Sequence, residues 1–219
     1  MLELKIQNVN KSYGEVDVLK DINLEIGASE KVVMLGASGS GKSTLLYLLG
    51  GLDKPSSGKI IVNNQDISQF NDDQLSRYRN ELVGFIFQFH FLLPSMNAIQ
   101  NILLPAQIGG HKVKKVKQQV LKMAEILKVD HLLKKYPHEL SGGEQQRINI
   151  LRALSLKPAL LLCDEPTGNL DSKNSEIVLN LILSLVEATG STLVLVTHNT
   201  SLASRINRKI SIEDGQIFR

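Results

Sequence analysis

The chain has 219 residues, 42% hydrophobic and 21% charged, which suits one sizeable globular domain, or a core with a smaller subdomain. Its net charge of +3 is too small to indicate a nucleic-acid partner, and no apolar run is long enough to cross a bilayer. The first residues do not resemble a signal peptide, and the single cysteine, Cys163, excludes an internal disulfide, so we expect a cytosolic protein with Cys163 in its core.

The first 62 residues predict short strands on both sides of a glycine-rich segment. Residues 2–6 and 22–26 alternate apolar and polar side chains, and residues 58–62 form a third such piece. These pieces do not continue a strand–helix alternation, so we expect an antiparallel arrangement beside the main sheet. Tyr13 lies on a turn, where it either stacks on an adenine ring or packs at a strand end.

The glycine-rich segment follows an apolar run at residues 31–35 and precedes a predicted helix that begins near Gly41. Strand, turn and helix are the context in which the string G-x-x-x-x-G-K-[ST] holds a polyphosphate. Backbone N–H groups converge there, Lys42 can reach the β- and γ-phosphates, and the Ser43 hydroxyl can ligate Mg²⁺. We therefore predict nucleoside triphosphate binding. The residues assigned to this site are Gly36, Ala37, Ser38, Gly39, Ser40, Gly41, Lys42, Ser43 and Thr44.

A second buried strand is predicted at residues 82–87, after a polar helix at residues 72–81. Gln88 follows this strand directly, at the sheet edge where α/β proteins bind ligands, and can ligate a metal or a water. The large apolar residues at 89–93 would be costly to expose without purpose. They indicate a contact surface, with internal packing as the alternative.

Residues 111–135 contain eight lysines and a helical apolar spacing, which predicts one amphipathic helix broken by Pro137. The lysine face is either attracted to anionic lipid headgroups or simply solvated. Next, Ser141 and Glu144 form a predicted capping box that starts another helix.

Two glycines, Gly142 and Gly143, occupy the first turn of that helix and weaken it by roughly 1 kcal/mol each. This cost is understandable if the backbone N–H groups must lie against a phosphate. A plain helix start is the alternative.

Two further buried strands carry candidate chemical groups at their ends. The apolar run at residues 159–163 leads into Asp164 and Glu165. Asp164 can hold Mg²⁺ through water, and Glu165 can deprotonate an attacking water. The run at residues 192–196 delivers His198 to the same edge, where we expect it to face the γ-phosphate. A helix at 173–188 and a hairpin with a type I′ turn at 209–218 complete the prediction.

Together these features resemble the ATP-binding subunit of ABC transporters over essentially the whole chain. The glycine-rich turn is similar to the Walker A motif, and residues 160–165 are similar to Walker B with its catalytic glutamate. Residues 140–147, LSGGEQQR, match the signature that is specific to this family. The remaining matches are Tyr13 at the adenine-stacking position, Gln88 at the Q-loop glutamine, Asp171 within the D-loop, and His198 at the switch histidine.

The resemblance implies an α/β fold: a P-loop NTPase core of ABC ATPase type, with an N-terminal antiparallel β-subdomain and a helical subdomain. Residues 1–219 would form a single ABC ATPase domain, in which the helical subdomain occupies about 90–138. The catalytic core with its β-subdomain would comprise residues 1–89 and 139–219.

The implied reaction is ATP hydrolysis, with ATP and Mg²⁺ as ligands. Glu165 would be the general base, and Lys42 and His198 would stabilise charge on the γ-phosphate. The resemblance assigns the metal site to three residues, which would hold the Mg²⁺: Ser43, Gln88 and, through water, Asp164.

The resemblance also implies partners. Two copies would form a homodimer on binding ATP, each nucleotide lying between the phosphate loop of one copy and Ser141, Gly142 and Gly143 of the other. Asp171 is assigned to this nucleotide site as part of the D-loop. Integral membrane permease subunits would bind the chain as a peripheral protein at the cytoplasmic face of the inner (cell) membrane.

A narrower resemblance concerns the cargo. The segments GASGSGKSTLL, FIFQFHFLLP, SGGEQQR and DEPTGNLD resemble the lipoprotein-releasing and macrolide-exporter branch, and FQFHFLLP most resembles its lipoprotein-releasing member. The expected function is therefore the ATPase of a bacterial transporter that extracts or exports lipoproteins. The alternatives are the ATPase of a macrolide or antimicrobial-peptide exporter, or a non-transporting regulator of a cell-envelope partner.

Overall fold

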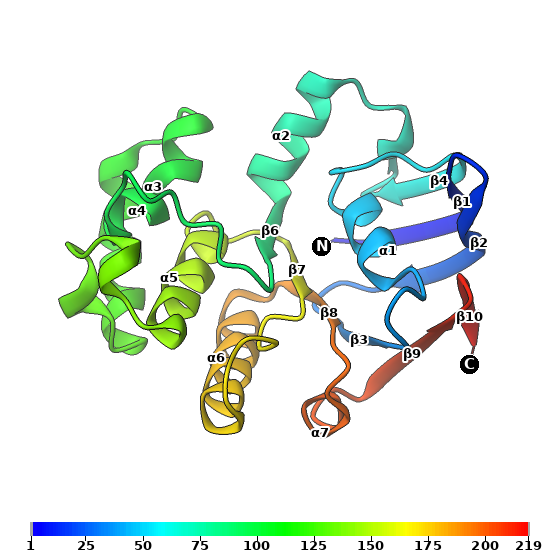
Figure 1. Ribbon diagram of the computed structural model, residues 1–219. Coiled ribbons are helices and arrows are strands. Elements are labelled where there is room, and N and C mark those ends of the chain that lie inside the picture. Colours follow the sequence, from blue (N-terminus) through cyan, green and yellow to red (C-terminus); the bar gives the residue numbers. More distant parts are fainter. Residues whose placement is uncertain (1, 219) are drawn as a thin grey trace.

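The computed structural model describes residues 2–218 and contains two β-sheets with helices between and beside them (Figure 1). The first sheet is antiparallel, in the order β2-β1-β4-β5, and the second has the order β10-β9-β3-β8-β7-β6. In the second sheet only the edge strand β10 runs antiparallel to its neighbour. The strands are β1 (Leu4–Tyr13), β2 (Val16–Ile26), β3 (Lys31–Leu35), β4 (Ser57–Val62), β5 (Gln65–Asp66), β6 (Val83–Ile86), β7 (Leu160–Asp164), β8 (Thr192–Val196), β9 (Arg208–Glu213) and β10 (Gln216–Phe218).

Helices separate the parallel strands along the chain. Those of regular α geometry are α1 (Lys42–Leu49), α2 (Asp72–Leu82), α3 (Ala98–Ile108), α4 (Val113–Ile126), α5 (Gly142–Leu154), α6 (Ser172–Thr189) and α7 (Thr200–Ala203). Short 3₁₀ segments are η1 (Ile67–Gln69), η2 (Asp130–Leu132) and η3 (Pro137–Glu139). The α/β class with an N-terminal antiparallel sheet, predicted from the sequence, is the fold observed.

Apolar residues alternate between the two faces of the parallel sheet, because neighbouring side chains on a strand point to opposite sides. On one face, Val32 and Val194 pack with α1 and the antiparallel sheet. On the other face, Val33 and Leu161 pack with α5 and α6. Both faces are covered, which explains why these strands are continuously apolar in sequence.

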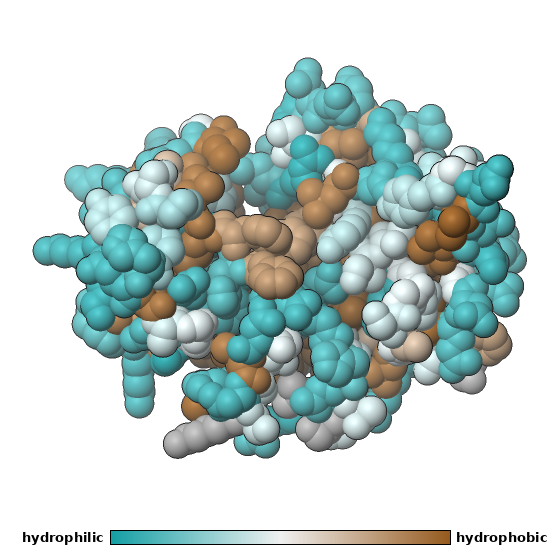
Figure 2. Space-filling model, in the orientation of Figure 1, coloured by the Kyte–Doolittle hydropathy of each residue, from teal (hydrophilic) through white to brown (hydrophobic). Residues whose placement is uncertain are grey.

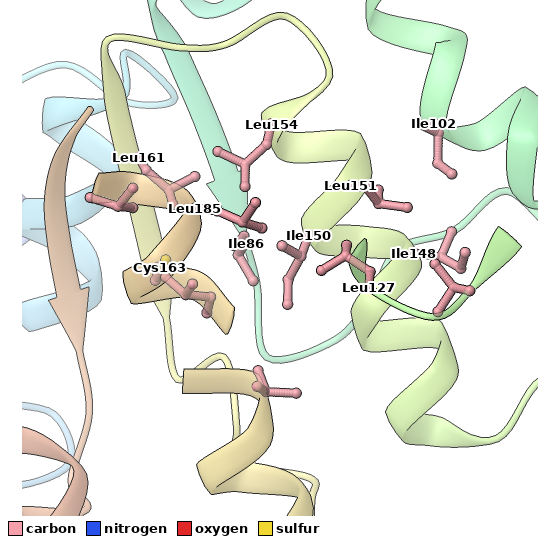
Figure 3. Close-up of a cluster of buried hydrophobic side chains, with 14 of the residues drawn as sticks. Ile86, Ile102, Leu127, Ile148, Ile150, Leu151, Leu154, Leu161, Cys163 and Leu185 are labelled. Carbon is pink, nitrogen blue, oxygen red and sulfur yellow. The ribbon is translucent and has the colours of Figure 1, made fainter. Parts of the chain in front are cut away.

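Helix α5 joins the parallel sheet to a helical group that contains α3 and α4. One side of α5 faces the sheet, where Leu154 lies near Ile86 of β6, and the other side faces α3, where Leu151 points toward Ile102 (Figure 3). All four side chains are fully buried. Because α5 packs against both parts, the subdomain boundaries at about 90 and 138 stay a prediction.

The helix expected between residues 111 and 135 is shorter than predicted. α4 ends at Ile126, and the backbone at Lys128 adopts the left-handed conformation, with φ of 54°. This turn carries Val129 and Leu132 into the core. The prediction was wrong in length because the apolar spacing after residue 126 serves a turn and a 3₁₀ segment, not another helical stripe.

The lysines of this region face solvent. They are exposed, apart from the half-buried Lys135, and no ion pair recorded between residues 2 and 218 includes any of them. The opposite side of α4 buries Val116, Val120 and Ala124, so its amphipathic pattern is confirmed. Neither lipid attraction nor plain solvation is favoured by this arrangement.

Cys163 lies fully buried in β7, as predicted, and burial raises the pKa of its thiol. Within the described residues, no helix combines the length and the apolar character needed to span a membrane.

Candidate functional site

The phosphate loop joins β3 to α1 through backbone conformations that only glycine adopts without strain. Gly36 and Gly41 have φ of 150° and 101°. A Cβ on Gly36 would lie 2.1 Å from the carbonyl oxygen of Ile212. The nearly buried Lys42 spans the loop and donates from Nζ to the Gly36 and Ala37 carbonyls, at 3.0 and 2.6 Å. The loop is therefore closed around its own lysine.

A cavity of about 560 Å³ opens beside this loop at the carboxyl ends of the parallel strands. It brings together side chains that are far apart in sequence, as expected for ligand sites in parallel α/β sheets. Its predicted members are Gly36, Ser38, Gly39, Lys42, Ser43, Gln88, Asp164, Glu165 and His198. The lining also includes four aromatic side chains that sequence reasoning did not assign to the nucleotide, namely Tyr47, Phe87, Phe89 and Phe91.

The other loop residues support the cavity from outside it. The Ser40 backbone N–H donates to the Ala37 carbonyl, and the Ser40 hydroxyl accepts from Lys42 Nζ at 3.3 Å. Thr44 lies in the first turn of α1, and its side chain contacts the Tyr13 hydroxyl.

Asp164 is nearly buried, and both of its carboxylate oxygens accept a hydrogen bond from α1. The Ser43 hydroxyl donates to Oδ1 at 2.8 Å, and the Tyr47 hydroxyl donates to Oδ2 at 3.0 Å. Burial, followed by the charge of Asp164, raises the pKa of Tyr47 to about 12. Tyr47 was missed from the sequence, although it lies four residues after Ser43 and so on the same face of the helix.

Glu165 stands at the end of β7 in a left-handed conformation, with φ of 46°. Such a conformation is costly for a residue with a side chain, and it concentrates at functional sites. Its carboxylate accepts from Nδ1 of His198 at 2.8 Å and from the Thr197 hydroxyl at 3.2 Å. Since an ionised carboxylate only accepts, Nδ1 carries the proton, and Nε2 of the exposed His198 ring is left for another partner.

Gln88 leaves the end of β6 and reaches the same cavity. Its Nε2 donates to Oδ1 of Asn169 at 3.3 Å, and Nδ2 of Asn169 donates to the Gln88 carbonyl at 3.1 Å. Oxygen ligands suit Mg²⁺. The Ser43 hydroxyl and the Gln88 side-chain carbonyl in one cavity, with the Asp164 carboxylate bonded to Ser43, therefore fit such an ion.

Tyr13 does not line the cavity and lies half exposed at the end of β1. Its hydroxyl donates to Oδ2 of Asp53 at 2.5 Å, and this hydrogen bond raises the pKa of Tyr13. Lys11 Nζ lies 4.6 Å from the ring centre. Adenine stacking stays a prediction.

The signature residues and Asp171 are not part of the cavity within one chain. Ser141 caps α5 in the predicted capping box, where its backbone N–H donates to Oε2 of Glu144 at 2.8 Å. Asp171 caps α6 by accepting from the Asn174 backbone N–H at 2.9 Å. A Cβ added to Gly142 would meet no atom within 4 Å. Nothing within the described chain therefore requires a glycine at Gly142.

A second cavity, a groove of about 330 Å³, lies between α2, β6, α3 and α5. Phe87 lines both this groove and the nucleotide cavity. The segment after Phe87 exposes Phe89 and Phe91 by 62% and 63%, whereas Leu92 packs partly against the core. Figure 2 shows apolar side chains gathered on this face between the helical group and the two sheets. Arg152 lines the groove.

Arg152 holds this segment in place. Its guanidinium donates to the carbonyls of His90 and Phe91, each at 2.7 Å. Burial lowers the pKa of Arg152.

A glycine-rich turn between a parallel strand and a helix, facing acidic residues at the tip of a neighbouring strand, defines a P-loop nucleoside triphosphatase. The sequence pattern of the ABC transporter family matches residues 19–168. The chain belongs to this family, and it is an ATP-binding, ATP-hydrolysing cassette.

Individual relatives and solved structures agree over nearly the whole chain. The lipoprotein-releasing system ATP-binding proteins LolD of Cytophaga hutchinsonii and Geobacter metallireducens are 45% and 44% identical, each over 98% of this chain and 98% and 97% of their own. The dimeric, post-hydrolysis structure of the ATP-binding cassette MJ0796 bound to ADP and Pi matches with a TM-score of 0.88 and 39% identity, covering 99% of this chain and 97% of that one. CbiO1 of Clostridium perfringens, part of the ABC transporter complex cbiONQ, matches with a TM-score of 0.89 and 27% identity, covering 99% and 86%. None of these names favours a macrolide exporter.

Proposed function

We propose that this chain is the ATPase subunit of a bacterial ABC transporter that releases lipoproteins from the membrane. The observation that carries the proposal is the nucleotide cavity, in which Lys42, Gln88, Asp164, Glu165 and His198 meet beside the phosphate loop. The lipoprotein cargo is supported by relatives of that name, which match at nearly full length.

In this proposal the described residues divide the work of hydrolysis. Ser43, Gln88 and, through water, Asp164 would hold Mg²⁺, which would supply neutralisation of the phosphate charge when bound. Lys42 exchanges its hydrogen bonds to the loop carbonyls for hydrogen bonds to phosphate oxygens. These are stronger, because both the ammonium group and the phosphate are charged whereas a carbonyl is neutral.

Glu165 acts as general base and takes the proton of the attacking water. It is held by His198 and Thr197, so that its carboxylate has a fixed direction. When Nε2 of His198 also carries a proton, it donates to a γ-phosphate oxygen and stabilises the charge there. Tyr13, whose hydroxyl contacts the Thr44 side chain, stacks on the adenine ring.

Two copies complete the site. Gly142 faces open space within its own chain, and the glycines weaken the start of α5 without packing in return. We infer that Ser141, Gly142 and Gly143 present backbone N–H groups to the nucleotide of a second copy, with Asp171 at the same interface. The structural relative with bound ADP and Pi is dimeric, which supports a homodimer here.

Membrane permease subunits dock at the groove between α2 and α3, in contact with Phe91. The chain is then a peripheral protein at the cytoplasmic face of the inner membrane. Exposed aromatic side chains beside an open groove are the form that a protein-binding surface takes.

The test is purification of the tagged chain from membranes in detergent, with mass spectrometry of the co-purified subunits. Reconstituted in vesicles with a lipid-modified protein, the complex should release that protein when ATP is added. The same complex carrying Glu165→Gln should retain it. A complex that hydrolyses ATP at full rate with these subunits and releases no lipoprotein contradicts the proposed cargo.

A further inference from the structure

The carboxylate of Asp164 is held at both of its oxygens by two residues of one helix. Ser43 and Tyr47 lie one turn apart on α1 and donate to Oδ1 and Oδ2, at 2.8 and 3.0 Å. Among residues 2–218 these are the hydrogen bonds recorded for the Asp164 side chain, which is 8% exposed. The rotation of the carboxylate about its Cβ–Cγ bond is therefore fixed by two donors.

Metal binding affects the two donors differently, because in the proposed site Ser43 is itself a metal ligand and Tyr47 is not. When the Ser43 oxygen ligates a cation through a lone pair, the hydroxyl can still donate its proton to Asp164. Its orientation is then set by the cation as well as by the carboxylate. The Tyr47 hydroxyl has no such second task, so its bond to Oδ2 persists with or without the ion. Groups that orient a metal-holding carboxylate typically change metal affinity or activity by 10- to 100-fold when removed.

We propose that Tyr47 is the positioning residue that holds Asp164 in its metal-binding orientation, and that it links this orientation to the docking groove through Phe87. The inference deepens the proposed function and rests on it.

The link to the groove consists of packed aromatic rings. The Tyr47 ring centre lies 6.4 Å from that of Phe87, at an interplanar angle of 57°. Phe87 stacks on Phe85 at 5.1 Å and meets Phe91 edge-on at 5.4 Å. Phe87 itself lines both cavities. A shift of Phe91 by a bound partner therefore reaches the Tyr47 ring through one intervening side chain.

The first experiment removes only the hydroxyl. Tyr47→Phe keeps the ring and its packing on Phe87, and its midpoint of thermal unfolding should stay close to that of the parent. Mn²⁺ replaces Mg²⁺ as the probe, and its affinity for the protein with ATP is measured by electron paramagnetic resonance. We expect an affinity lower by about 10- to 100-fold, while binding of ATP without metal is unchanged.

Two variants control this result. Tyr78→Phe removes the hydroxyl of a buried tyrosine, which donates to the Leu49 carbonyl, and should leave Mn²⁺ affinity unchanged. Tyr47→His restores a donor on a shorter side chain and should recover part of the affinity. Parental Mn²⁺ affinity in Tyr47→Phe overturns the proposal. If the parent protein with ATP binds no Mn²⁺, the metal site of the proposed function fails instead.

A second experiment tests the link through Phe87. Phe87→Leu should weaken Mn²⁺ affinity by a few-fold, and the double variant with Tyr47→Phe should be no weaker than Tyr47→Phe alone. Phe70→Leu is the control, since Phe70 is partly buried but lines neither cavity and has no recorded ring contact with Tyr47 or Phe87 among the described residues. Additive losses in the double variant would show that Phe87 does not act through the tyrosine.

Discussion

Gly142→Ala should raise the thermal stability of the monomer and weaken association of the homodimer. Gly142 is the first residue of α5, directly after the capping Ser141, and it does not have a positive φ. An added Cβ meets no atom within 4 Å, so alanine fits the isolated chain without strain. In the proposed homodimer the same methyl group stands where the backbone must approach a phosphate.

The size of the first effect follows from helix propensity. Alanine is better than glycine by about 1 kcal/mol inside a helix, and the first turn realises about half of that or more. For a chain of this length, 1 kcal/mol moves the midpoint of thermal unfolding by about 2–4 °C. We therefore expect the nucleotide-free variant to unfold about 1–4 °C higher than the parent.

The second effect is measured in the Glu165→Gln background, which keeps ATP bound. Light scattering at tens of micromolar protein should show ATP-driven dimers of the parent and at least tenfold weaker association with Gly142→Ala. Gln118→Ala, on the exposed face of α4, is the matched control and should dimerise as the parent does. A variant that is less stable as a monomer, or that dimerises normally, would refute the reasoning.

Three further outcomes are expected. Glu165→Gln should bind ATP but lose turnover by about 10²–10⁴-fold in a phosphate-release assay; near-parental turnover would assign the base elsewhere. Gly50→Ala should cost about 1–3 kcal/mol of unfolding free energy, because its Cβ would lie 1.8 Å from Cζ of Phe85; an unchanged denaturant midpoint would contradict the observed packing. Phe91→Ser should leave the thermal midpoint unchanged and weaken pull-down of the membrane subunits, whereas Leu92→Ser should lower the midpoint, since Leu92 packs on the core.

Local pattern was sufficient to predict the parallel strands and the ends of several helices. The strands at 159–163 and 192–196 are apolar on both faces because both faces are covered, and this leaves a direct mark in the sequence. Ser141 was predicted as a cap from Glu144 three residues later, and the structure contains that box. Short-range chemistry of this kind does not depend on the rest of the fold.

Features set by distant partners were not predictable in the same way. Helix α3 contains Pro105, a residue that normally breaks a helix, and the helix persists within a packed group. The role of Tyr47 depends on Asp164, which is 117 positions away in the chain. The separation of exposed Phe91 from partly buried Leu92 likewise follows from packing that the apolar run at 89–93 does not reveal.

The hydrogen bonds from Arg152 to the His90 and Phe91 carbonyls bear on the thermodynamics of docking. A loop that is ordered only on contact loses about 1–2 kcal/mol of backbone entropy for each residue it fixes. Here the hydrogen bonds from Arg152 order the segment during folding, so docking does not incur this loss of backbone entropy. The exposed Phe91 then contacts its partner as part of a rigid surface. A substitution of Arg152 would then weaken docking entropically, in addition to removing a side chain that lines the groove itself.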